Sequence, residues 1–108
     1  MTDDMLQKLL ALHHKLRDKH EVIRANHVAH VLARSAKVSE EYGELMDEVL
    51  SHLSLQRRDK LNAYKRDNLA KEYADTVLAL YLLGLSLDLN IDQVVSNRLD
   101  EKYQEYVK

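Results

Sequence analysis

The chain contains no proline and only two glycines in 108 residues, so very little in it interrupts a helix. Leucine, valine and alanine supply most of the apolar positions, and phenylalanine and tryptophan are absent. A chain of this length forms one domain with a core of modest size. We therefore expect residues 1–108 to fold as a single all-α domain.

The helical spacing of apolar residues predicts four helices. The acids after Thr2 suit the positive end of the first helix, Asn26 suits the cap of the second, and Asp92 caps or opens the fourth. The charged stretch 18–25 is the expected bend after the first helix. The expected helices run from about Asp3 to Arg17, from Asn26 to Leu55, from Asp59 to Leu87 and from Ile91 to Tyr106.

The stretch from Val77 to Leu85 is apolar on nearly every side of its helix. Such a helix must be buried on more than one side, and a 12.6 kDa chain has little bulk with which to cover it. We therefore expect a homo-oligomer, either a homodimer or a homotetramer built from dimers.

Acidic side chains gather at two places. Glu41, Glu44 and Glu48 share a strip of the second helix, and Glu72 and Asp75 lie three residues apart on the third, with Glu72 inside its apolar sector. A carboxylate that points into a helix interface costs free energy unless another charge compensates it. Oxygen ligands of this kind suit a hard divalent cation, and the pattern predicts Mg²⁺. The strip adjoins the expected apolar stripe of Val38, Tyr42, Leu45, Val49 and Leu53.

Cationic and amide side chains accompany these acids. Arg34 and Lys37 continue the acidic strip of the second helix; they either pair with the acids at i, i+4 or meet phosphate oxygens. Lys65 and Asn68 precede the acids of the third helix on one polar ribbon. A ribbon of cation, amide and two acids is more typical of an active site than of a structural network.

The histidines fall into two groups. His13, His14 and His20 have no carboxylate or cysteine partner at ligand spacing, so we expect them to be surface residues. His27 and His30 share a helix face at i, i+3, but two histidines without a third ligand are weak evidence for a metal. We expect this second pair to line a substrate pocket instead.

Composition excludes several classes of partner. A net charge of −2 does not indicate binding to a nucleic acid polymer. The absence of cysteine rules out disulfides and thiolate metal sites and suits a reducing compartment. No apolar run reaches membrane-spanning length, and residues 1–12 lack the separate apolar core of a secretory signal. We therefore expect a cytoplasmic protein without a membrane partner.

The acidic pattern resembles a known family. Glu-Glu-x-x-Glu at Glu40, Glu41 and Glu44, followed about a helix hairpin later by Glu-x-x-Asp at Glu72 and Asp75, resembles the motif of the MazG-like all-α nucleoside triphosphate pyrophosphohydrolases. The resemblance covers roughly residues 31–106. It implies a four-helix bundle-like, oligomeric fold whose Mg²⁺ ligands, with Mn²⁺ as an alternative, are Glu41, Glu44, Glu72 and Asp75.

The resemblance also implies the reaction, in which a nucleoside triphosphate and water give the monophosphate and pyrophosphate, as in the house-cleaning of ribo- or deoxyribonucleotides. Glu40 would act with Glu41 and Glu44 as a supporting acid that helps to activate water. Two departures from the family pattern leave base selectivity open: Ala79 stands where an aromatic residue or histidine is common, and Arg98 and Lys102 stand in for a lysine–asparagine pair. With the cations and the amide of the two polar strips described above, the predicted substrate contacts are Arg34, Lys37, Lys65, Asn68, Arg98 and Lys102.

A second hypothesis from another class stays open. The chain would then be a non-catalytic helical interaction module whose acids are solvated faces, or a divergent family member without turnover. The position of Glu72 inside the apolar sector favours the enzyme, because a surface cluster does not explain it.

Overall fold

The structure is a computed structural model that describes residues 1–19, 26–54 and 66–108. Within these ranges it contains four α-helices and no strand: α1 (Asp3–Lys19), α3 (His27–His52), α5 (Arg66–Ser86) and α6 (Ile91–Tyr106). The all-α prediction is confirmed, and the predicted bounds of the first, second and fourth helices agree to within three residues. The predicted start of the third helix at Asp59 and most of the predicted bend lie outside the described residues.

Short polar side chains begin the helices. The side chain of Asn26 accepts a hydrogen bond from the Ala29 N–H at 3.2 Å, as predicted for the cap of α3. At α6 the cap is Asn90, which accepts from the Gln93 N–H at 3.3 Å. Asp92 therefore stands in the first turn of α6 and pairs with the N-terminal amine of Met1 at 3.3 Å.

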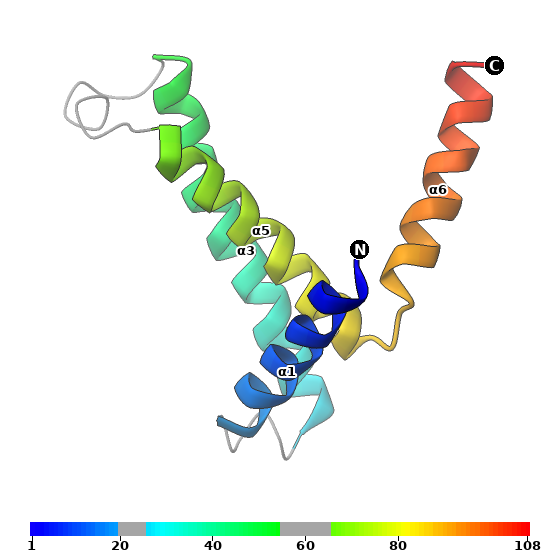
Figure 1. The fold of residues 1–108 in the computed structure, drawn as a ribbon. Helices are drawn as coiled ribbons and strands as arrows, with labels where there is room; N and C mark the ends of the chain where they lie inside the picture. The colour runs from blue at the N-terminus through cyan, green and yellow to red at the C-terminus, as the bar shows by residue number, and fades with distance from the viewer. Residues whose placement is uncertain (20–25, 55–65) are drawn as a thin grey trace.

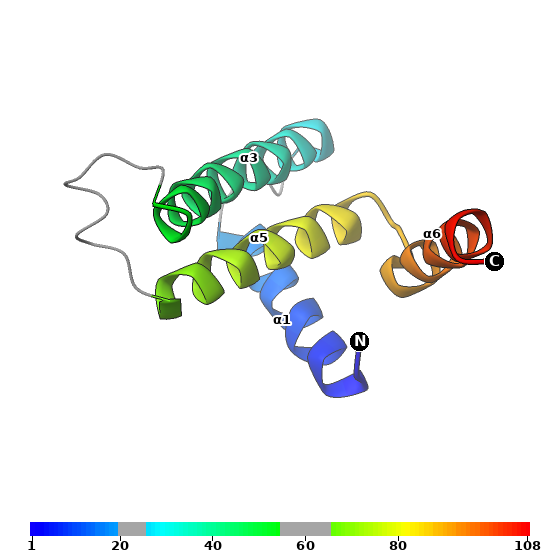
Figure 2. The same ribbon diagram turned by 90° about the horizontal axis from the view of Figure 1, so that it is seen from above.

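The body of the molecule is an antiparallel hairpin of α3 and α5, which lie side by side along most of their length (Figure 1). α1 crosses the end of this hairpin at which α3 begins and α5 ends (Figures 1 and 2). A long-range hydrogen bond joins the crossing helices: Nη2 of Arg34 on α3 donates to the backbone carbonyl of His13 on α1 at 3.2 Å. The first half of α3 and the second half of α5 thus meet α1 at one end of the molecule.

A tight turn separates α6 from this hairpin. Asp88 adopts a left-handed conformation with φ 56°, and the Leu89 N–H donates to the Gly84 carbonyl at 3.0 Å, which ends α5. A β-carbon at Gly84 would lie 3.0 Å from Cγ1 of Ile91, so the missing side chain lets the start of α6 close against α5. α5 and α6 meet at a bend of 110°, and every α6 residue after Ile91 is exposed.

The core of one chain is small. Its buried apolar side chains, in the described ranges, are Leu9, Ala79 and Leu82. The accessible surface is 8179 Å², against about 6,200 Å² for a compact protein of this mass. The radius of gyration is 16.8 Å, against about 13 Å for a compact domain of this length. The four helices do not close into a bundle within one chain, because α6 diverges from the hairpin instead of packing along it (Figure 1).

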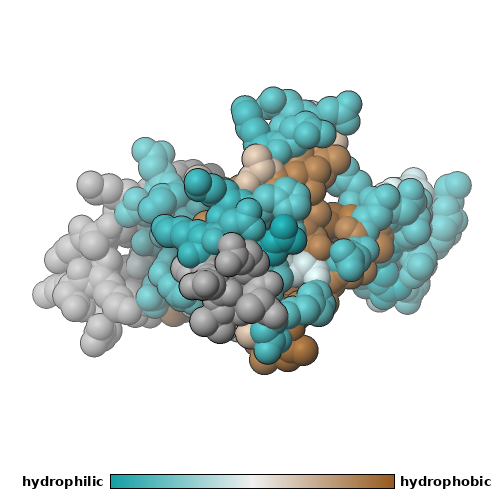
Figure 3. All heavy atoms as spheres, turned by 90° about the horizontal axis from the view of Figure 1, so that it is seen from below, coloured by the Kyte–Doolittle hydropathy of each residue, from teal (hydrophilic) through white to brown (hydrophobic). Residues whose placement is uncertain are grey.

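The surface is correspondingly apolar in places, and the view from below shows a broad hydrophobic patch with hydrophilic borders (Figure 3). The α5 segment that we expected to be buried on several sides is only partly covered, since Leu78 and Leu80 are 40% and 50% exposed. Among the described residues, no single helix is long and apolar enough to cross a membrane, and α5 and α6 pass on length and composition only as a bent pair. Other exposed apolar side chains are Val28, Leu32, Tyr73, Val94, Val95, Leu99 and Tyr103.

Candidate active site

Three carboxylates from two helices converge in the middle of the hairpin. Glu41 comes from α3, and Glu72 and Asp75 come from successive turns of α5; each offers an oxygen, and these oxygens lie within 4.8 Å of one another. The i, i+3 spacing on α5 turns both of its acids toward α3. Glu41 is buried, and the two α5 acids are half-buried. The structure thus brings together three of the four predicted metal ligands.

Two of these acids have an oxygen that is buried without a hydrogen-bond partner in the described residues, Oε2 of Glu41 and Oε2 of Glu72. A buried carboxylate oxygen without a partner loses its hydration and gains nothing in return. A divalent cation with hard oxygen ligands would satisfy both atoms at once. The donor set therefore fits Mg²⁺ or Mn²⁺. Glu48, two turns further along α3 than Glu41, also has a buried Oε2 without a partner among the described residues.

Glu44, the fourth predicted ligand, is exposed and stands outside the group of three. The group still affects its ionisation, because the charge of Glu41 and the hydrogen bond with the Glu72 carboxyl both raise the pKa of Glu44. Like charges so close together favour the protonated acid. Glu44 therefore lies at the solvent edge of the acidic cluster.

Thr76 fixes the relation between the two helices at this point, and the sequence did not single it out. Its Oγ1 lies 2.8 Å from the Glu72 carbonyl in its own helix and 3.2 Å from the Glu41 carbonyl in α3, and it donates to them. The hydroxyl is buried directly after the last acid of the motif. The one feature of the sequence that could have indicated this role is a small hydroxyl residue directly after the last motif acid, on the inner face of the helix.

Among the described residues, Lys37 is the cation that pairs with the acids of α3. Its Nζ lies 3.0 Å from Oε1 of Glu41 and 3.4 Å from Oε1 of Glu40. The hydrogen bond to Glu41 is the main reason that the pKa of Lys37 is raised. Glu40 is exposed and is not in the group of three, so within one chain it is an outer acid paired with Lys37.

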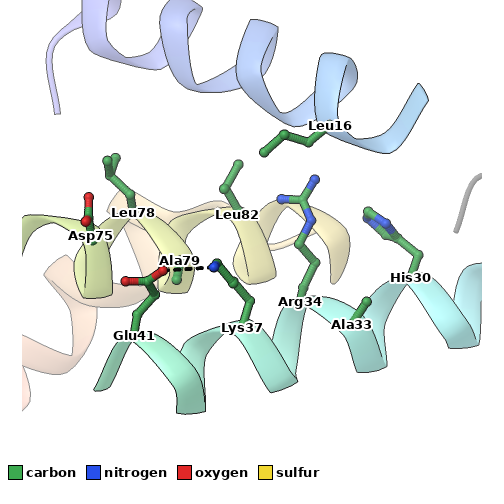
Figure 4. Close-up of a pocket in the computed structure, with 10 residues that line it drawn as sticks. All are labelled: Leu16, His30, Ala33, Arg34, Lys37, Glu41, Asp75, Leu78, Ala79 and Leu82. Carbon is green, nitrogen blue, oxygen red and sulfur yellow. Dashed lines mark ion pairs between the residues drawn. The ribbon is translucent and has the colours of Figure 1, made fainter. Parts of the chain in front are cut away.

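A pocket of about 400 Å³ extends from the acids along α3 (Figure 4). Asp75 and Glu41 stand at one end of it, and Arg34 and His30 stand at the other, with Lys37 between them (Figure 4). Apolar side chains of α1 and α5 form much of its wall. The complete lining is Leu16, His30, Ala33, Arg34, Lys37, Glu41, Asp75, Leu78, Ala79 and Leu82.

Arg34 is buried at the cationic end. Its Nη2 donates to the His13 carbonyl, and its Nη1 has no partner among the described residues. Burial lowers the pKa of Arg34, and the neighbouring charge of Arg17 lowers it further. A guanidinium with a spare, desolvated N–H group is a strong donor for an anion.

The remaining predicted substrate contacts that the structure describes, Asn68, Arg98 and Lys102, do not line this pocket. Asn68 is exposed in the first turn of α5, and Lys65 lies outside the described residues. Arg98 pairs with Glu101 on the exposed α6, and Lys102 lies over the Tyr106 ring at 5.8 Å. Because α6 diverges from the hairpin, these two cations stay away from the acids of the same chain (Figure 1).

The predictions for the individual histidines have different outcomes. His14 is exposed as expected, but the surface prediction for His13 is wrong, because α1 packs over the hairpin and leaves this side chain only 8% exposed. His20 lies outside the described residues. His30 lines the pocket as expected, whereas His27 lines a neighbouring hollow.

Comparison with known proteins found no protein-family model, no curated sequence and no solved structure that matches the chain. Functional inference therefore depends on the arrangement of the residues themselves.

Proposed function

We propose that the protein is an Mg²⁺-dependent nucleoside triphosphate pyrophosphohydrolase, which converts a triphosphate and water to the monophosphate and pyrophosphate. The observation that carries the proposal is the convergence of Glu41, Glu72 and Asp75, with two buried carboxylate oxygens that lack a partner. The similarity of the acidic motif to the MazG-like enzymes supports the same reaction.

The residues that would hold the metal are Glu41, Glu72 and Asp75, and Glu44 at the solvent edge would complete the set. When bound, Mg²⁺ supplies screening of the triphosphate charge and lowers the pKa of the attacking water. Mn²⁺ has the same preference for oxygen ligands and is the alternative. Glu40 lies beside this set and supports it by sharing Lys37 with Glu41.

The rest of the pocket suits a nucleotide. Lys37 lies next to the acids and Arg34 lies about one turn further along α3, so phosphate oxygens could meet both cations while the acids face the metal (Figure 4). Leu16, Leu78 and Leu82 offer an apolar wall for the nucleoside. The cations would thus hold the triphosphate, and the apolar wall would contact the nucleoside.

The test is product analysis with a panel of ribo- and deoxyribonucleoside triphosphates and Mg²⁺. We expect monophosphate and pyrophosphate, with no turnover after chelation of the metal. Orthophosphate as the primary product, or no turnover with any nucleotide, would reject the proposal in favour of a helical interaction module or a family member without turnover.

We also propose that the working form is a homodimer, or a homotetramer built from dimers. The single chain exposes about 2,000 Å² more surface than a compact protein of its mass, whereas a standard interface removes about 800 Å² from each partner. The apolar side chains exposed on α5 and α6 are those that an interface would cover. Arg98 and Lys102 would then approach the acids only from a neighbouring copy.

Light scattering tests the assembly. Leu99 is 66% exposed on α6, so an aspartate there is accommodated within one chain but not in an apolar interface. We expect Leu99→Asp to shift the molar mass toward the monomer, while Gln104→Asp on the same exposed helix serves as the matched control. A monomeric wild type at micromolar concentration would contradict the assembly.

A further inference from the structure

A second hollow, of about 210 Å³, lies at the end of the molecule where α1 crosses the hairpin. It is on the far side of His30 from the acidic cluster, and His30 also lines the pocket of Figure 4. The proposed hydrolysis uses none of the three other basic groups of this hollow, His13 and Arg17 on α1 and His27 on α3. The lining residues are His13, Arg17, His27, His30, Leu85, Ser86 and Asp88.

Basic nitrogens in this hollow are buried without partners. Nδ1 of His13, Nδ1 of His30 and Nε of Arg17 have no hydrogen-bond partner among the described residues, and Nη1 of the adjacent Arg34 is in the same condition. His13 and His30 are only 8% and 4% exposed. Water therefore has little access to either ring. The unpartnered arginine N–H groups favour a ligand that accepts hydrogen bonds, and the imidazole nitrogens do so when they carry a proton.

The hydrogen bonds of Ser86 indicate which nitrogen of the neutral His30 ring carries the proton. Its Oγ donates to the Leu82 carbonyl at 3.0 Å and lies 2.7 Å from Nε2 of His30. With the serine proton on the carbonyl, the hydroxyl oxygen accepts from Nε2–H, and Nδ1 of the neutral ring is bare. Protonation of the ring then places a new N–H donor on Nδ1, which otherwise has no partner.

The charges that act on the two rings are positive. Burial, followed by the charges of Arg34, His14, Arg17 and His30, lowers the pKa of His13 to about 4. Burial, Arg34, Arg17 and His27 lower the pKa of His30 in the same way. Both rings are therefore neutral at pH 7, and an anion placed between them and the arginines would reverse both trends.

The acids near these rings are few. Asp88 is exposed and is the lining carboxylate, contributed from the end of α5. Oδ1 of Asp18 lies 3.8 Å from Nε of Arg17, which is beyond hydrogen-bond distance. Both of these side chains are partly exposed. Neither acid is among the charges that shift the two imidazoles. Among the described residues, the one carboxylate that lines the hollow is thus exposed, and no buried acid pairs with the two rings.

We propose that this hollow is a second binding site, specific for a tetrahedral oxyanion of the phosphate type and held by Arg17, Arg34, His13 and His30. Such an anion offers only acceptors, which match the N–H groups of Arg17 and Arg34 and, once the imidazoles are protonated, the Nδ1–H groups of His13 and His30. A metal cation does not fit, because two guanidinium groups surround the rings and the acidic group on α3 and α5 is the candidate metal cluster in the described ranges. Binding tightens as the pH falls, since the bound anion favours the protonated imidazoles.

Two sources supply this chemistry, inorganic phosphate and the pyrophosphate released by the proposed reaction. Arg34 and His30 also line the pocket of Figure 4, whereas His13 and Arg17 do not, and the test below involves neither Mg²⁺ nor turnover, so it can fail or succeed independently of that reaction. Sulfate is the most useful probe, since it keeps the same charge between pH 6 and pH 8. Any pH dependence of sulfate binding therefore reports on the protein.

The test is calorimetric titration of the full chain with sulfate, phosphate and pyrophosphate in the presence of a chelator, at constant ionic strength. Arg17 and His27 line this hollow and not the pocket of Figure 4, so Arg17→Gln and His27→Gln are the informative variants. The matched control is Arg98→Gln, which removes an exposed guanidinium of α6. In parallel, ¹⁵N spectra of the imidazoles follow protonation of His13 and His30 directly.

We expect sulfate to bind the wild type several-fold more tightly at pH 6 than at pH 8 and to shift both imidazoles toward the protonated form. Arg17→Gln should raise Kd about tenfold, His27→Gln should raise it less, and Arg98→Gln should leave it unchanged. Tighter binding of pyrophosphate than of phosphate would identify the product as the ligand, and the reverse would identify free phosphate. An unchanged Kd in folded Arg17→Gln, or no imidazole shift on adding any of the three anions, would overturn the site.

Discussion

Two regions along the α3–α5 hairpin, one acidic and one basic, bury opposite charges. In the middle of the hairpin, Glu41 meets the acids of α5, and Lys37 is their nearby cation. At the end that α1 crosses, two histidines and two arginines meet with Asp88 at the edge. Both regions contain buried polar atoms that have no partner in the described residues.

In the free chain, the unpartnered atoms of both regions cost free energy that a ligand of the opposite charge would offset. The described residues bury seven polar or charged side chains but only three apolar ones. Groups buried in this way cost free energy until a ligand of the opposite charge completes them. The buried polar side chains are His13, His30, Arg34, Glu41, Ser51, Thr76 and Ser86.

The largest expected effect separates the two regions by activity. Glu41→Gln or Asp75→Asn should lower turnover at least a hundredfold, on the order of 2.7 kcal/mol in the barrier, because each removes a metal ligand. Helix content by circular dichroism should stay unchanged. Sulfate binding without metal should persist in Glu41→Gln, whereas its loss would show that the two regions form one site. The exposed Glu105→Gln on α6 is the control with full turnover.

The next effect is a difference in the response to acid. The pKa of His13 is about 4 in the folded state against 6.5 when unfolded, so the folded state holds fewer protons. Its contribution to the unfolding free energy is thus present above pH 6.5 and is lost as the pH falls toward 4, on the order of 3 kcal/mol in all. In the acidic region the sign is opposite, because the raised pKa of Glu44 makes the folded state hold more protons.

Urea denaturation between pH 7.5 and pH 4.5 measures this response. We expect the wild type to lose stability steadily over that interval and His13→Gln to lose much less. The matched control is His14→Gln, which removes an exposed imidazole from the same helix and should follow the wild type. Parallel curves for wild type and His13→Gln would refute the acid response assigned to the basic region.

A third effect comes from the metal. Mg²⁺ that binds only the folded state stabilises it by about 2.7 kcal/mol at a hundredfold excess over Kd, which corresponds to several degrees in Tm. Glu72→Gln removes one charge from the cluster, so this variant should melt higher than the wild type without metal and gain less from Mg²⁺. Equal gains in both proteins would remove Glu72 from the metal ligands.

The smallest expected effects compare two hydroxyls that join α5 to α3. Thr76 donates to the Glu41 carbonyl in the acidic region, and Ser86 bonds the His30 ring in the basic region. Thr76→Val should cost about 1 kcal/mol of unfolding free energy, since it removes a hydrogen bond but keeps the shape. Ser86→Ala should cost about 2 kcal/mol, because it leaves a buried ring nitrogen without its partner. Chemical denaturation at pH 7.5 would contradict this ranking if the threonine variant were the weaker protein.

The sequence alone determined the helices and the spacing of the acids. The bounds of α6 follow from a polar break and the apolar period, and the cap at Asn26 follows from a local hydrogen bond. That Glu72 and Asp75 share a face also follows from the geometry of one helix. These features depend on residues a few positions apart, so the order of the chain contains them.

The tertiary structure decided which faces are inside. A period of 3.6 residues fixes angles around one helix but not the direction of its partner, and here α5 meets α3 beside Glu41. Tyr42 and Leu53, expected on the apolar stripe, are therefore more than half exposed, while Glu41 is 9% exposed. The same reason hid the basic hollow, because His13 and His30 are 17 residues apart and meet, with ring centroids 5.9 Å apart, only after α1 has crossed the hairpin.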